Sequence, residues 1–134
     1  MAKNPSNVKL LGKQVVRFFA RSADEDVRVL SNFYMMNVET KFGGYKSGEH
    51  AFQAAKMEIA VLYADAEDQK DRLCKHITAI EKARTALDAK KLGGKGGCKS
   101  NGVQLTEKQL EAWNQTCVAV QQEICRYKFQ HNSE

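Results

Sequence analysis

Residues 47–56 read SGEHAFQAAK, and this segment predicts the start of an amphipathic helix. Ser47 is a preferred N-cap residue, which places Glu49 in the first turn, where the helix dipole favours a carboxylate. At about 100° per residue, Gln53 lies about 40° from Glu49 around the helix, and Lys56 lies about 20° from it. An acid, an amide and an amine therefore share one side of the predicted helix.

Two interpretations of this side are open. In one, Glu49 and Lys56 converge beside the small side chains of Ala51, Ala54 and Ala55 and polarise a bond in a small ligand. In the other, Glu49 and Lys56 are solvated residues of an ordinary amphipathic helix. Spacing alone favours the second interpretation, so the flanking sequence has to decide between them.

The flanking sequence carries several motifs in a fixed order. Those before the helix are FF at 18–19, SNF at 31–33 and GGY at 43–45; those after it are AKKLG at 89–93, Trp113 and KF at 128–129. Together with the central segment, in which several uncommon residues match in order, this arrangement resembles the NADAR family, also called YbiA-like. The resemblance covers roughly residues 15–131, which is most of the chain.

The resemblance implies an α+β fold, mostly helical, in which a small antiparallel or mixed sheet packs against several helices. It also implies chemistry on ribose N-glycosidic bonds. Some members of the family hydrolyse a phosphorylated ribosylaminopyrimidine of riboflavin biosynthesis, and others remove ADP-ribose from guanine bases of nucleic acid. The expected ligand is therefore a phosphorylated ribose or ADP-ribose, and no cofactor is expected.

Matching the family's motif by position implies that Glu49 and Lys56 are the catalytic pair. The resemblance further implies that the ligand pocket contains Phe19, Ser31, Asn32, Tyr45, His50 and Gln53. Cleavage of an N-glycosidic bond builds positive charge at C1 and the ring oxygen, which a carboxylate stabilises. A desolvated lysine can protonate the departing base or attack C1 of the opened sugar to form a Schiff base. For the polar pocket residues, a local role in capping turns and helices is the competing interpretation.

The chain departs from the family pattern in two places. An Asp-x-x-Trp-Gly motif, which usually follows the tryptophan-containing helix, does not occur before Glu134, and a glycine is missing near residues 26–28. Three expectations follow: an enzyme completed by a partner, a minimal active variant, or a non-catalytic protein that binds ADP-ribose or another nucleotide. Oligomeric state is not predicted.

Length and composition predict one soluble domain over residues 1–134, with loose termini at 1–12 and 131–134. No apolar run approaches the roughly 20 residues that span a bilayer, and the first residues lack a signal-peptide core, so a cytoplasmic location without membrane contact is expected. The four cysteines form no CxxC pair and share no ligand spacing with histidine. We therefore expect reduced thiols, no metal, and surface positions for His76 and His131.

Residues 82–99 contain six basic residues and one acid, a net charge of +5 that equals the excess of the whole chain. The segment runs into the glycine-rich sequence 93–102, where Lys95 and Lys99 are candidate phosphate-binding residues. The sequence lacks Gly-Lys-Ser/Thr and is not a Walker A loop. A solvated loop without function is the alternative, and the backbone phosphates of nucleic acid are a candidate partner. A general nucleic-acid binder is less favoured, because no aromatic residues interleave with the basic ones.

The remaining pattern predicts strands at 14–20 and 27–30 and a hairpin of 37–40 with the residues around Tyr45. It then predicts helices at 48–63, 66–77 and 79–91. A final helix is expected from Thr106, where TEKQ fits a capping box, towards Phe129. Leu110, Trp113, Val118, Ile124 and Phe129 are predicted core residues of that helix.

Overall fold

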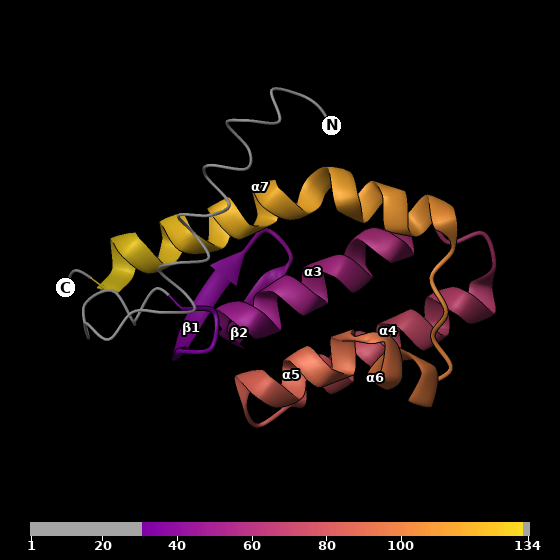
Figure 1. Cartoon of the computed structure of the whole chain (residues 1–134), viewed down its shortest axis with the longest axis horizontal. Helices are drawn as coiled ribbons and strands as arrows, with labels where there is room; N and C mark the ends of the chain where they lie inside the picture. The colour runs from indigo at the N-terminus through magenta and orange to yellow at the C-terminus, as the bar shows by residue number, and fades with distance from the viewer. Residues whose placement is uncertain (1–30, 133–134) are drawn as a thin grey trace.

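The computed structural model describes residues 31–132. This part of the chain has an α+β fold that is mostly helical, as predicted (Figure 1). Its elements in order are β1 (Met35–Thr40), β2 (Gly43–Ser47), α3 (Gly48–Leu62), α4 (Glu67–Lys82), α5 (Ala86–Gly93), α6 (Lys95–Ser100) and α7 (Glu107–Asn132). The expected strands at 14–20 and 27–30, the N-terminal segment 1–12 and Phe19 lie outside the described residues.

Strands β1 and β2 form the predicted hairpin. They pair antiparallel, with Val38 opposite Tyr45 and Thr40 opposite Gly43. Gly43 has a φ of 142°, a backbone conformation that side-chain-bearing residues rarely adopt, which explains a glycine at the turn. The inner residues Val38 and Tyr45 are buried, so one face of the hairpin packs against the helices.

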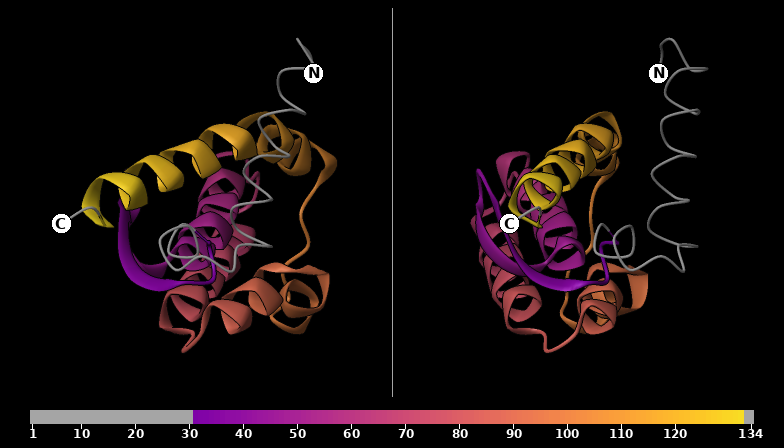
Figure 2. Two further views of the ribbon diagram at one scale, coloured as in Figure 1. Left: turned by 60° about the vertical axis from the view of Figure 1, so that its left-hand side comes forward. Right: turned by 90° about the vertical axis from the view of Figure 1, so that its left-hand side faces the viewer.

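Helix α3 is the centre of the fold. Helix α7 packs along one side of it, and α4 and α5 pack along the other (Figures 1 and 2). The buried alanines Ala51, Ala54, Ala55 and Ala60 allow these helices to approach α3 closely. Met57 fills the space between them and is fully buried. The small residues of α3 therefore allow other helices to pack against it on more than one side.

Helix α7 begins with the predicted capping box. The Thr106 hydroxyl accepts a hydrogen bond from the Gln109 backbone N–H over 3.1 Å, and Gln109 Oε1 accepts one from the Thr106 N–H over 2.8 Å. Trp113 and Ile124 are buried core residues, as expected. The core prediction for Val118 and Phe129 is wrong, since both side chains are exposed.

The reason is the direction of these side chains around α7. Val118 lies about 140° and Phe129 about 160° from Trp113, so they face away from α3. The core prediction for Leu110 is also wrong, because this residue is exposed in the first turn of the helix. A long helix that packs on one side buries only one stripe of its apolar residues.

The boundaries of α4 and α5 also differ from the prediction. Leu73, Ile77 and Ile80 keep one face of α4 buried across residue 78, where a break was expected. The break falls at 83–85 instead, because the Thr85 hydroxyl accepts the Asp88 backbone N–H and caps α5.

The glycine-rich segment 93–102 is not the loop that its composition predicts, because it contains α6. The helix ends in a Schellman arrangement: the Val103 N–H donates to the Cys98 carbonyl over 2.8 Å, and the Gly102 N–H donates to the Lys99 carbonyl over 3.1 Å. Gly102 has the positive φ, 71°, that this ending requires. Capping at its end thus offsets the low helix propensity of glycine.

Within residues 31–132, no helix is both long enough and apolar enough to cross a membrane.

Candidate active site

The first turn of α3 positions Glu49. The Ser47 hydroxyl accepts the His50 backbone N–H over 3.1 Å, and the Glu49 N–H donates to the Asn32 carbonyl over 2.8 Å. Both contacts satisfy N–H groups that a helix leaves free at its start. The side chain of Glu49 is only 7% exposed. A carboxylate is thus held at the positive end of the helix dipole, mostly out of water.

Gln53 lies one turn further along α3 and contacts Glu49 directly. Its Nε2 donates to Oε2 of Glu49 over 2.7 Å. Its Oε1 is buried and has no hydrogen-bond partner among residues 31–132. Gly93 of α5 lies against this amide, so close that a Cβ there would be 2.0 Å from Oε1. The orientation of the Gln53 amide is therefore fixed from two sides.

Lys56 reaches the same glycine from the next turn of α3. Its Nζ donates to the Gly93 carbonyl over 3.1 Å. Lys56 lies about 10 Å from Glu49 along the helix axis, at 1.5 Å per residue. The predicted catalytic pair is thus brought to one side of α3, with Gln53 and Gly93 between its two members.

The Ser31–Asn32 turn braces the start of α3 against α7. The side-chain amides of Asn32 and Gln121 exchange two hydrogen bonds, of 2.7 and 2.9 Å. The Ser31 hydroxyl accepts the Phe33 N–H over 3.1 Å. These bonds turn the Asn32 side chain towards Gln121, while the Asn32 carbonyl contacts the backbone of Glu49.

Lys128 completes this brace from the far end of α7. It is fully buried, and its Nζ donates to the Ser31 carbonyl. Burial lowers the pKa of Lys128 to about 8, with a smaller opposing effect of Cys125. No carboxylate pairs with it among the described residues, in which the ion pairs are Lys70–Glu67 and Arg72–Asp68.

The structure places the other two predicted pocket residues elsewhere. His50 is fully buried, with Nδ1 2.6 Å from the Ser47 hydroxyl and Nε2 donating to the Ala83 carbonyl over 2.8 Å. Tyr45 packs near Glu58, which lies about 180° from Glu49 around α3. Burial, followed by Glu58 and Glu81, raises the pKa of Tyr45 to about 12. Both residues hold the hairpin and helices together, away from the Glu49–Lys56 side.

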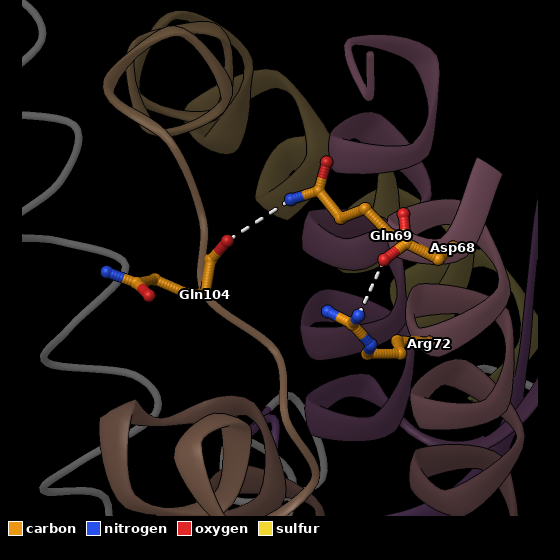
Figure 3. Close-up of polar contacts among 4 residues, drawn as sticks. All are labelled: Asp68, Gln69, Arg72 and Gln104. Atoms are coloured by element: carbon orange, nitrogen blue, oxygen red, sulfur yellow. Dashed lines mark hydrogen bonds and ion pairs between the residues drawn. The ribbon is translucent and has the colours of Figure 1, made fainter. Parts of the chain in front are cut away.

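A cavity of about 550 Å³ opens beside Lys56. The candidate phosphate-binding residues Lys95 and Lys99 line it together with Lys56. The segment 102–105 forms another part of its wall. This segment is tied to α4, because Gln69 Nε2 donates to the Gln104 carbonyl over 3.1 Å (Figure 3). One turn further along α4, Arg72 pairs with Asp68 over 2.6 Å (Figure 3). The Cδ of Arg72 lies 3.6 Å from the position that a Cβ on Gly102 would take.

The prediction of a surface position for His76 is wrong. His76 is buried, and its Nε2 donates to the Leu92 carbonyl over 2.7 Å. Its Nδ1 lies 2.9 Å from Nδ2 of Asn101, which can only donate, so Nδ1 accepts. Burial lowers the pKa of His76, in keeping with a neutral ring. His131, by contrast, is exposed as expected.

The contacts of Gln121, Gly93 and His76 in this region were not predicted from the sequence. Gln121 and Lys128 lie seven residues apart on α7, a spacing that puts them on one face of the helix. That spacing, together with the KF motif at 128–129, is the signal that would have suggested an inward-facing lysine. The contact of Gly93 with Gln53 has no comparable local signal.

Within the described residues, no three side chains among His, Cys, Asp and Glu gather closely enough to hold a metal ion. All four cysteines are free thiols.

Comparisons with models of protein families, with curated proteins and with solved structures found no match for this chain.

Proposed function

We propose that this protein is a NADAR-like hydrolase that cleaves the N-glycosidic bond of an ADP-ribosyl or ribosylamine-phosphate substrate. The observation that carries the proposal is the buried Glu49 carboxylate. It accepts a hydrogen bond from Gln53 and has no cationic partner among residues 31–132. Removing a carboxylate from water is costly unless its charge is compensated. The positive charge that develops on a ribosyl group during cleavage would supply this compensation.

Hydrolysis breaks the bond between C1 and the base nitrogen, and the electron pair leaves with the base. A water molecule forms the new C1–O bond. In our proposal, Glu49 stabilises the charge at C1 and accepts the proton that this water loses. Gln53 holds the carboxylate in one orientation through its hydrogen bond.

Lys56 is proposed to donate a proton to the departing base nitrogen and to recover one from solvent. Its Nζ donates one hydrogen bond to the Gly93 carbonyl, which leaves two N–H bonds for a ligand. The position of Lys56 at the cavity of about 550 Å³ supports this role. A second route for the same residue is attack of its amine on C1 of the opened sugar. The C1–N bond to the base breaks, the base leaves with its electron pair and takes up the proton that the amine loses, and water then hydrolyses the resulting Schiff base to regenerate the lysine.

The test is turnover of two substrates: DNA that carries ADP-ribosylated guanine, and the phosphorylated ribosylaminopyrimidine. We expect the protein to release the free base from one of them. Glu49→Gln keeps the size of the side chain and should lower kcat by about 100-fold or more. Glu111→Gln, which changes an exposed glutamate on α7, is the matched control and should leave kcat unchanged.

The competing function is binding without catalysis. Binding of ADP-ribose with no turnover of either substrate would overturn the hydrolase and favour a non-catalytic binder. Borohydride reduction during turnover tests the Schiff-base route. A covalent adduct that is lost in Lys56→Arg supports this route, and absence of an adduct from the active protein rules it out.

A further inference from the structure

The cavity beside Lys56 is lined by both cationic and apolar side chains. Three lysines, Lys56, Lys95 and Lys99, line this cavity, and the described residues that line it include no acid. Val103, Leu105 and Leu110 contribute apolar surface to it. Its volume of about 550 Å³ lies within the range of about 300–1,000 Å³ that is usual for small-molecule sites.

None of the three lysines forms an ion pair with an acid among residues 31–132. Lys95 and Lys99 are four residues apart on α6, a spacing that brings like charges to one side of a helix and destabilises it. Two unpaired cations beside Lys56 create a positive potential in a concave site, and such a site attracts anions.

The apolar side of the cavity explains an exposed leucine. Leu110 is exposed in the first turn of α7, although its neighbour Trp113 is buried. The segment that carries Val103 and Leu105 is held by the Schellman end of α6 and by the bond from Gln69 to Gln104 (Figure 3). The segment 102–105 is therefore held by two independent sets of hydrogen bonds.

We infer that this cavity binds the nucleoside diphosphate end of the substrate, with the diphosphate at Lys95 and Lys99 and the nucleobase against Val103, Leu105 and Leu110. The inference rests on the proposed function and selects an ADP-ribosyl substrate over a ribosylamine monophosphate. A diphosphate would contact both Lys95 and Lys99, and a nucleobase would contact the apolar side chains. A nucleic-acid backbone is less suitable, since its phosphates would contact the exposed lysines without using the apolar side chains of the cavity.

Equilibrium binding of ADP to the full chain tests the site without any bond to cleave. The double variant Lys95→Gln/Lys99→Gln should weaken ADP binding by about tenfold or more, because charge-assisted hydrogen bonds are lost. The double variant Lys75→Gln/Lys82→Gln removes the same charge from exposed positions on α4 and should change the affinity less than twofold. Circular dichroism verifies that both variants are folded.

The apolar side has a separate test. Leu110→Gln should weaken ADP binding and leave binding of inorganic pyrophosphate unchanged, because pyrophosphate has no base. Equal losses of ADP affinity in the α4 and α6 double variants would overturn the site, since they would mean that ADP responds only to the overall charge of the protein. Binding of single-stranded DNA but not of ADP would also overturn it, in favour of a nucleic-acid surface.

Failure of this inference and failure of the proposed function are distinguishable. Glu49→Gln should bind ADP as the natural sequence does, because Glu49 is not assigned to the diphosphate. ADP binding that depends on Lys95 and Lys99 in a protein without turnover would support this site and reject the hydrolase. Turnover of the ADP-ribosyl substrate with a KM insensitive to the α6 variant would support the hydrolase and reject this site.

Discussion

Gln53 donates a hydrogen bond to Glu49 over 2.7 Å while the other side of its amide lies against Gly93. A carboxylate can only accept, so the nitrogen of the Gln53 amide must face Glu49 and its oxygen must face α5. This oxygen has no hydrogen-bond partner among residues 31–132. The cost of leaving it unpaired is consistent with a side chain that is held for its effect on Glu49.

The first prediction replaces this amide by an acid, in Gln53→Glu. Two carboxylates at hydrogen-bond distance share one proton, which raises the upper pKa of the pair in the folded state. The folded variant then binds more protons than the unfolded chain, so its free energy of unfolding falls as the pH rises through that pKa. We expect the variant to lose about 2 kcal/mol relative to the natural sequence between pH 4.5 and pH 8.

Denaturant titrations at the two pH values measure this loss. Gln115→Glu places the same new acid at an exposed position of α7 and should show a change below about 0.5 kcal/mol. A pH-independent difference between Gln53→Glu and the natural sequence would mean that the two side chains do not meet.

The second prediction concerns Gly93, which lies against the amide of Gln53. In Gly93→Ala the new methyl group would lie 2.0 Å from Oε1 and 2.5 Å from Cδ of Gln53. Overpacking of this kind costs about 1–3 kcal/mol, and we expect a loss of about 2 kcal/mol in the free energy of unfolding. In Gly94→Ala the nearest atoms are carbonyl oxygens at 3.5 and 3.6 Å, which is ordinary contact, so this variant is the control. Equal stabilities of the two variants would contradict the contact.

Local signals predicted much of the fold. The Ser47 cap, the glycine turn of the hairpin and the Thr106–Gln109 capping box each act within a few residues, and each is present in the structure. The proximity of Glu49 and Gln53 follows in the same way from one helical turn. Such features depend on neighbouring residues, so a single sequence contains them.

The contacts that brace the candidate site could not be predicted in this way. Lys56 meets Gly93 across 37 positions, Asn32 meets Gln121 across 89, and Lys128 meets Ser31 across 97. These pairs depend on how α3, α5 and α7 pack, and no local pattern specifies that packing. His76 was misplaced for the same reason, because its partners Leu92 and Asn101 lie 16 and 25 positions away.

The third prediction distinguishes a helix from a loop at the glycine-rich segment. A Cβ on Gly96 would meet no heavy atom within 4 Å, whereas a Cβ on Gly97 would lie 2.3 Å from the Lys91 carbonyl oxygen and 2.5 Å from the Leu92 Cα. Gly96→Ala should therefore raise the free energy of unfolding by up to about 1 kcal/mol through helix propensity. Gly97→Ala should lower it by about 2 kcal/mol through the backbone clash. Thermal unfolding of the two variants measures both effects, and shifts of the same sign would be the result expected of a flexible loop.

The fourth prediction concerns Lys128, the buried cation that holds the Ser31 carbonyl. Its pKa is lowered from 10.5 to about 8 in the folded protein because burial disfavours the charged form. Between these two values the unfolded chain binds the additional proton, so the free energy of unfolding contributed by Lys128 rises with pH. Below pH 8 both states are protonated and the folded protein carries the full cost of the buried charge.

In Lys128→Met this contribution is absent. The natural sequence should therefore gain about 2 kcal/mol relative to the variant between pH 7.5 and pH 10, as measured by denaturant titration. The buried thiol of Cys98, whose pKa burial raises, is present in both proteins, so the comparison removes its titration. Lys75→Met removes an exposed lysine of α4, and the natural sequence should show no such gain in the free energy of unfolding relative to this variant. If the difference stays constant across this range, Lys128 keeps an ordinary pKa, and the brace between α7 and the Ser31 turn does not exclude water as the structure indicates.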